Sequence, residues 1–132
     1  MRSEVTARER ITAVYAASGF LIAFIGVCHE VVGEALFPYG PAVFGGPVGW
    51  HAFGALIVAV GLWIFAAVLW GRRSFVLPVA ILLIPLGLSI FAYAATRGDF
   101  HLFALAGVAA MSSVVVCERR LRALGRDGED VA

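Results

Sequence analysis

Long uncharged, apolar stretches alternate with short polar segments along the whole chain. Four such stretches cover residues 11–28, 52–71, 74–96 and 102–117. As α-helices they would be roughly 24–35 Å long, which is close to the thickness of the hydrocarbon core of a bilayer. Each stretch is apolar on nearly all sides, a pattern typical of a membrane span and not of an amphipathic surface helix.

The alternation predicts an all-α fold, a polytopic membrane protein in which four transmembrane helices form an up-down bundle. Residues 1–118 would form this domain, and residues 119–132 would form a charged tail that is disordered beyond one further helical turn. The expected spans are about residues 9–33, 50–71, 74–96 and 100–118.

Residue types that favour helix ends occur close to these limits. Short polar side chains cap helices because they accept hydrogen bonds from the first backbone N–H groups, and Trp is enriched where a span leaves the hydrocarbon. The candidates are Thr6 with Glu9 as a capping box, Ser74 and Asp99 as single caps, and Trp50 and Trp70 as interfacial anchors.

Composition indicates lipid as the main solvent of this chain. Of 132 residues, 61% are hydrophobic and 14% are charged, whereas soluble domains average about 45–50% apolar and about 25% charged residues. A chain this short cannot bury so much apolar surface in a core of its own. The basic residues form no patch on one face, so nucleic acid is excluded as a partner.

The arginines predict the orientation of the bundle. With four crossings, nine of the ten basic residues fall on one side of the membrane, and only Arg97 falls on the other. The positive-inside rule places the nine, and with them both termini, in the cytoplasm. All ten basic residues are Arg, which suggests a GC-rich genome, and we expect a multi-pass protein of the bacterial cytoplasmic (inner) membrane.

Small residues recur at alternating spacings of four and three along the first span, and at a similar rhythm in the second. Such stripes let helix backbones approach closely in lipid. The predicted helix-packing seam consists of Ala16, Gly19, Ala23 and Gly26 in the first span and Gly54 and Gly61 in the second.

All three histidines are expected at one level, at the outer face. Glu30 is the only charged member of the first stripe, so it faces protein, and we predict that it pairs with His51. Ionisable groups at membrane depth are costly and often functional. The candidate binding residues of this outer-face cluster are His29, Glu30, Glu34, His51 and His101.

Imidazole and carboxylate groups at one level can ligate zinc or copper, and two histidines can hold haem iron. The candidate metal ligands are His29, Glu30, His51 and His101. The alternative is a structural role, in which these groups are solvated or lock two helices together. We expect no cofactor and no catalytic residue, with a metal or haem as the alternative.

The segment between the first two spans, residues 35–49, carries no charge but three aromatic residues, three prolines and four glycines. A loop of this length without secondary structure is usually functional or disordered, and this one is too apolar for ordinary disorder. It is interpreted either as a lid over the histidine level or as a segment packed in the membrane interface.

The size and the four-span layout resemble those of small uncharacterised bacterial inner-membrane proteins, among them the DoxX-like proteins. This resemblance rests on layout, so it implies a fold and a location but no site residues. Three functions stay open: a non-catalytic accessory or scaffold protein, a metal- or haem-binding protein, and a small dimeric transporter or channel using Glu30. The expected partners are the lipid bilayer and either a second copy of the chain or another membrane protein.

Overall fold

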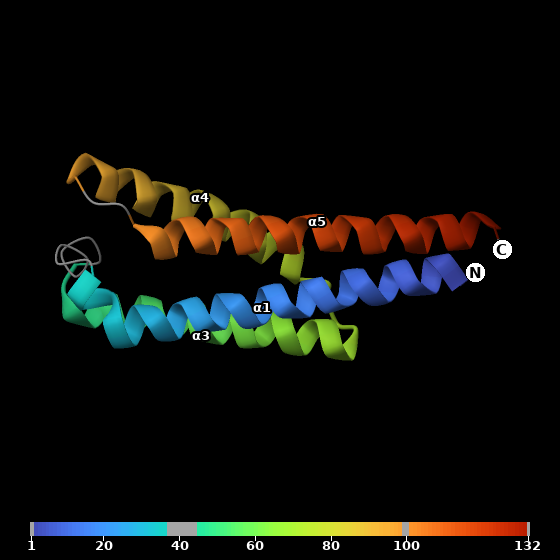
Figure 1. The fold of residues 1–132 in the computed structure, drawn as a ribbon, viewed down its shortest axis with the longest axis horizontal. Helices are drawn as coiled ribbons and strands as arrows, with labels where there is room; N and C mark the ends of the chain where they lie inside the picture. Colours follow the sequence, from blue (N-terminus) through green and yellow to red (C-terminus); the bar gives the residue numbers. More distant parts are fainter. Residues whose placement is uncertain (1, 37–44, 99–100, 132) are drawn as a thin grey trace.

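The computed structural model describes residues 2–36, 45–98 and 101–131, with the side chains of residues 2, 4, 34–36 and 126–131 left out. The described residues form four α-helices in up-down order (Figure 1). Each helix is long and apolar enough to cross a membrane, which confirms the predicted all-α fold with four candidate spans. They are α1 (Arg2–Leu36), α3 (Pro47–Trp70), α4 (Val76–Thr96) and α5 (Leu102–Val131).

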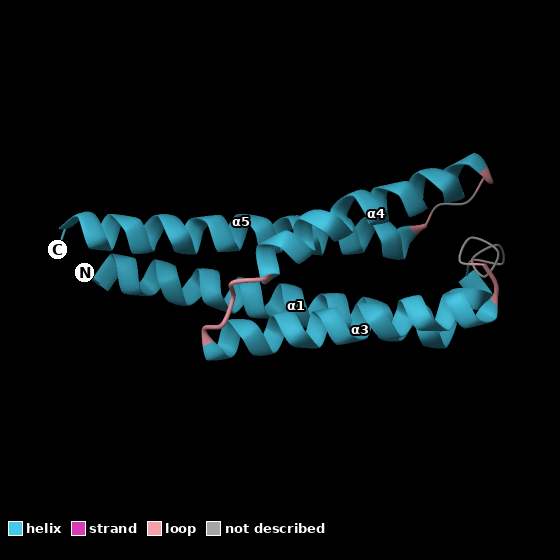
Figure 2. Ribbon diagram, turned by 180° about the vertical axis from the view of Figure 1, so that it is seen from behind, coloured by secondary structure: helices cyan, strands magenta, loops and turns pink. Residues whose placement is uncertain are grey.

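The two ends of the bundle differ in chemistry. Both termini and the α3–α4 turn, which contains Arg72 and Arg73, lie toward one end, here called the arginine end (Figures 1 and 2). The opposite end holds His29 near the end of α1, His51 near the start of α3, and His101 directly before α5. We call it the histidine end.

The helices pack as two pairs that are joined through α1 and α5. The pairs are α1 with α3 and α4 with α5, and α1 also packs against α5 (Figure 2). A polar contact lies in the α1–α5 interface, where the hydroxyls of Ser18 and Ser113 are 2.9 Å apart. Because Ser18 gives its single proton to the carbonyl of Val14, at 2.8 Å, the Ser113 hydroxyl donates to that of Ser18.

The α1–α3 interface is a contact between backbones. A Cβ atom added to Gly26 would lie 2.7 Å from the backbone nitrogen of Val58. One added to Gly61 would lie 2.7 Å from the carbonyl oxygen of Gly19 and would also meet the backbone of Ala23. Only glycine allows this approach, which gives the two helices a large area of van der Waals contact in the absence of large interlocking side chains.

Two of the predicted helix caps differ from the structure, and a third lies outside the described residues. Helix α1 begins at Arg2, so Thr6 lies inside the helix and does not start it. Helix α4 begins at Val76 after Phe75, with no side-chain hydrogen bond at its cap, so the predicted cap Ser74 is wrong. Asp99, predicted to cap α5, lies outside the described residues.

Trp50 is a further correction. It was expected as an interfacial anchor, but its side chain is completely buried. The indole lies against Gly33 of α1, where a Cβ atom would collide with the ring. Because Gly33 has no side chain, the indole fits between the two helices. It therefore does not lie in the membrane interface. Trp70, at the other end of α3, is exposed as an anchor would be.

Helix α5 continues well past the expected boundary at residue 118 and ends at Val131. Two contacts support the extension. Leu121 is buried in the core, and Glu118 and Arg122, one helical turn apart, form an ion pair at 2.9 Å, a spacing that stabilises helices.

Candidate functional site

The carboxylate of Glu30 and the imidazole of His51 form a hydrogen-bonded pair at the histidine end. Nδ1 of His51 donates a hydrogen bond to Oε2 of Glu30 at 2.8 Å. The pairing expected from the sequence is therefore present. The contact joins α1 to α3, and its side chains are 31% exposed for Glu30 and 52% for His51, so it lies at the edge of the helix pair.

Gly54 makes the room that Glu30 occupies. A Cβ atom at this position of α3 would collide with the Glu30 carboxylate and would lie 2.8 Å from the ring of His29. The second carboxylate oxygen of Glu30, Oε1, is buried and makes no hydrogen bond within the part of the chain that the structure describes. Gly54, one of the predicted seam residues, thus makes room for the carboxylate of Glu30 as well as for the close approach of the two helices.

His29 is buried and held on two sides. Its Nε2 lies 3.0 Å from the carbonyl oxygen of Trp50, and because a carbonyl oxygen only accepts, Nε2 carries the proton. The imidazole stacks on the indole of Trp50 with ring centroids 3.7 Å apart, and Phe53 contacts it edge-on. This arrangement fixes the position of the ring and its Nε2 proton.

His101 is the N-cap residue of α5. Its Nδ1 accepts a hydrogen bond of 3.0 Å from the backbone N–H of Ala104, the third residue of the helix, which is the pattern of a capping side chain. In the neutral imidazole the proton is then on Nε2. The side chain is also buried. The sequence reading assigned His101 to the binding cluster and did not foresee the cap.

An apolar cavity of about 60 Å³ lies between the two helix pairs. All four helices contribute to its wall, and His29 and His101 are the histidines that line it, while His51 and Glu30 do not. The remaining wall is almost entirely aliphatic and aromatic, for example Ile57. The three histidines therefore occupy different surroundings, two beside a buried cavity and one at the surface.

The four candidate metal ligands, His29, Glu30, His51 and His101, all lie in the described part of the chain. Among the described residues, no group of three or more His, Cys, Asp or Glu side chains is close enough together to hold a metal ion. The side chain of Glu34 lies outside the described part of the chain, and so do residues 37–44 of the expected lid.

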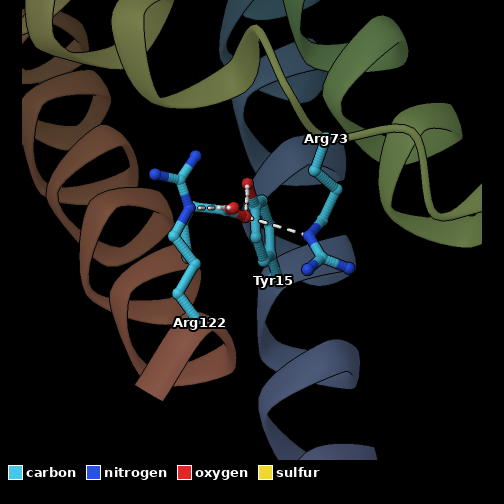
Figure 3. A network of polar contacts seen from close by, with 4 residues as sticks. Tyr15, Arg73 and Arg122 are labelled. Atoms are coloured by element: carbon cyan, nitrogen blue, oxygen red, sulfur yellow. Dashed lines mark hydrogen bonds and ion pairs between the residues drawn. The ribbon is translucent and has the colours of Figure 1, made fainter. Parts of the chain in front are cut away.

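A second polar group, at the arginine end, was not foreseen. Glu118 of α5 is only 2% exposed, yet both of its carboxylate oxygens are satisfied (Figure 3). Oε2 accepts from the Tyr15 hydroxyl of α1 at 3.0 Å and from Nε of Arg73 at 2.9 Å. Oε1 accepts from Nε of Arg122 at 2.9 Å. We call these four residues the Glu118 network.

The network connects three parts of the fold through one carboxylate. Gly71 ends α3 in the left-handed conformation, with φ of 72°, which glycine adopts at little cost. The resulting turn directs Arg73 toward α5, where Glu118 lies at the same level. A buried ion pair needs such complete hydrogen bonding to offset the loss of hydration.

The sequence did contain a signal for this network. Glu118 directly follows the last apolar stretch, and Arg122 lies one helical turn further along. In an up-down bundle the end of the fourth span and the turn between the second and third lie at the same level, so Arg73 could have been placed beside Glu118. The partner Tyr15 carries no such signal, because its apolar neighbours suggest ordinary core packing.

Comparisons with known proteins give no assignment: no protein-family model matches this chain, and no curated protein or solved structure is significantly similar to it. The resemblance in layout to the DoxX-like proteins therefore stays a prediction.

Proposed function

We propose that this chain is a non-catalytic accessory or scaffold subunit in the bacterial cytoplasmic membrane, with both termini in the cytoplasm. Four apolar helices of sufficient length support the membrane location. The concentration of arginine at one end supports the orientation, since translocating arginine across a membrane is disfavoured. Only Arg97, next to the end of α4, lies toward the histidine end.

The observation that carries the accessory role is the position of α4. Among the described residues α4 has substantial contacts with α5 alone, and it is the least buried of the four candidate spans. Large apolar side chains such as Leu82 and Leu88 are exposed along it. A helix held from one side presents its other faces to lipid or to a partner helix.

Site-specific photo-crosslinking in intact membranes tests this proposal. A photoreactive residue at Leu82 of α4 is compared with one at Leu62 of α3, because both leucines are exposed. The proposal predicts a discrete protein adduct of defined mass from position 82 and none from position 62. Adducts with lipid alone from both positions would contradict a partner on α4.

A metal- or haem-binding role is the second candidate, and the two histidines beside one cavity favour it. Size argues against haem. The cavity of about 60 Å³ is smaller than the roughly 150 Å³ that accommodates benzene in an engineered protein core, so a haem enters only if the helix pairs separate. Metal analysis and an absorption spectrum of the detergent-purified protein decide this: bound metal or a Soret band would replace the first proposal.

Transport through Glu30 has less geometric support. The carboxylate faces Gly54 and pairs with His51, and Glu30 does not line the cavity between the helix pairs. A coupling residue would need to face a path across the protein. Ion or drug flux into liposomes that disappears on the substitution Glu30→Gln would revive this alternative.

A further inference from the structure

A hollow lined by charged and aromatic side chains opens beside the Glu118 network. It has a volume of about 690 Å³ and is formed by the α3–α4 turn and the facing part of α5. Arg72, Arg73 and Arg122 line it together with the hydroxyl-bearing Ser74. The sequence predictions did not include this hollow, whose walls come from the α3–α4 turn and from a part of α5 about 45 positions later in the chain.

The hollow carries excess positive charge. Glu118 is the acidic residue in its wall, against three arginines, which leaves a formal charge of +2 from three positive and one negative group. Arg73 and Arg122 use Nε to bind the carboxylate, and their terminal nitrogens point away from it (Figure 3). The two side chains stay 27% and 48% exposed, so their outer N–H groups can reach a ligand.

An adjoining groove is lined mainly by tryptophan and alanine side chains. Trp63, Ala66, Ala67 and Trp70 line it, and it shares Trp63 and Arg72 with the hollow. Trp is enriched at the level of lipid headgroups. The arginines of the hollow therefore adjoin a tryptophan-lined groove, an order of side chains that matches the headgroup and acyl chains of a phospholipid.

We propose that this hollow binds the phosphate of an anionic phospholipid, with the acyl chains along the tryptophan groove. Guanidinium groups match phosphate oxygens in charge and in hydrogen-bonding geometry. Glu118 holds the Nε atoms of two of the three guanidiniums, so these side chains already lie in the wall of the hollow before the lipid arrives. This inference rests on the membrane location proposed above. A soluble phosphate offers the same headgroup chemistry but leaves the groove empty, and we therefore commit to the lipid.

Native mass spectrometry of protein purified in mild detergent tests the site. The probes are phosphatidylglycerol, which is anionic, and phosphatidylcholine, which is zwitterionic, with matched acyl chains. We expect selective retention of phosphatidylglycerol. Arg72→Gln should weaken it roughly fivefold, the usual effect of one arginine near an anionic headgroup. Arg72 is the cleanest position because it lines the hollow without contacting Glu118.

Arg120→Gln is the matched control, because Arg120 is an exposed arginine near the same end of α5 that does not line the hollow. Equal retention of both lipids, or equal weakening by Arg72→Gln and Arg120→Gln, would overturn the proposal. Glycerol 3-phosphate serves as the soluble competitor. Displacement of the lipid by equimolar glycerol 3-phosphate would assign the hollow to a soluble phosphate and would also overturn it.

Failure of the membrane proposal is detected separately, by alkaline extraction of membranes. A protein released by alkali would refute the membrane location and, with it, the lipid site. A protein that stays in the membrane fraction but shows no preference for phosphatidylglycerol would refute the lipid site alone.

Discussion

The hydroxyl of Tyr15 on α1 donates a 3.0 Å hydrogen bond to the buried carboxylate of Glu118 on α5, 103 positions away in the sequence. This contact closes the α1–α5 interface at the arginine end, and Arg73 joins the α3–α4 turn to the same carboxylate. The carboxylate of Glu118 therefore joins the two helix pairs. At the histidine end, by contrast, the Glu30–His51 pair joins only α1 and α3.

Glu118→Gln should be destabilising. The amide keeps the shape of the side chain but removes the charge that pairs with Arg73 and Arg122. Breaking a buried ion pair costs about 3–5 kcal/mol, and the loss here should lie toward the lower limit, because the two arginines that remain are 27% and 48% exposed. The free energy of unfolding in detergent measures this loss. Tyr15→Phe removes one hydrogen bond to a charged group and should cost less, about 1.5–3 kcal/mol.

The matched control for the charge is Glu9→Gln, since Glu9 is exposed on α1 and should change stability by about 0.5 kcal/mol or less. A loss of the same size from Glu9→Gln and Glu118→Gln would contradict the central position assigned to the network.

Gly61→Ala should separate α1 from α3. The added methyl group meets the backbone of Ala23, and overpacking of this kind typically costs about 1–3 kcal/mol. A lower unfolding midpoint of the variant would show this loss of stability. Gly107→Ala in α5 is the control, because a Cβ atom there meets nothing within 4 Å. Replacing a helical glycine by alanine at an open position should stabilise by up to about 1 kcal/mol.

The Glu30–His51 pair should contribute little to stability. Both side chains are partly exposed, and exposed ion pairs contribute about 0.2–1 kcal/mol. A double-mutant cycle with Glu30→Gln and His51→Gln measures the coupling energy directly. A coupling above about 3 kcal/mol would show that the pair is a principal structural contact and would contradict its placement at the edge of the bundle.

His101→Ala should destabilise α5 by about 1 kcal/mol, the usual loss when a capping side chain is removed, and His101→Asn should restore most of it because Asn also caps helices. Unfolding midpoints of the three proteins provide the comparison. If Asn were no better than Ala, the hydrogen bond to Ala104 would not be the main contribution of this histidine.

The parts of this fold that depend on local pattern could be predicted from the sequence. Uninterrupted apolar stretches fix the number of helices, and a stripe of small residues that includes Glu30 implies an interface that holds this acid against protein. His51 could be predicted as the partner of Glu30 because it lies at the start of the next span. The stripe itself continues past Glu30 to Gly33. These inferences need only helical periodicity and the order of the spans.

The remaining features depend on contacts between distant segments. Trp50 is of a residue type that is typical of interfacial anchors. It is buried because Gly33 on α1 has no side chain and leaves space for the indole. His101 becomes a cap because α5 begins at Leu102 and not two residues earlier. Tyr15 pairs with Glu118 because α1 packs against α5. The helical periodicity of one span does not show which other span lies beside it.

Cysteine labelling in intact spheroplasts tests the orientation of the bundle most directly. In a protein carrying Cys28→Ser and Cys117→Ala, a single cysteine is placed by Ser74→Cys in the α3–α4 turn or by Thr96→Cys at the end of α4. Both residues are exposed. A membrane-impermeant maleimide should label position 96 in intact spheroplasts and position 74 only after permeabilisation. Labelling of position 74 from outside, or of both positions alike, would contradict a four-span protein with its arginine end in the cytoplasm.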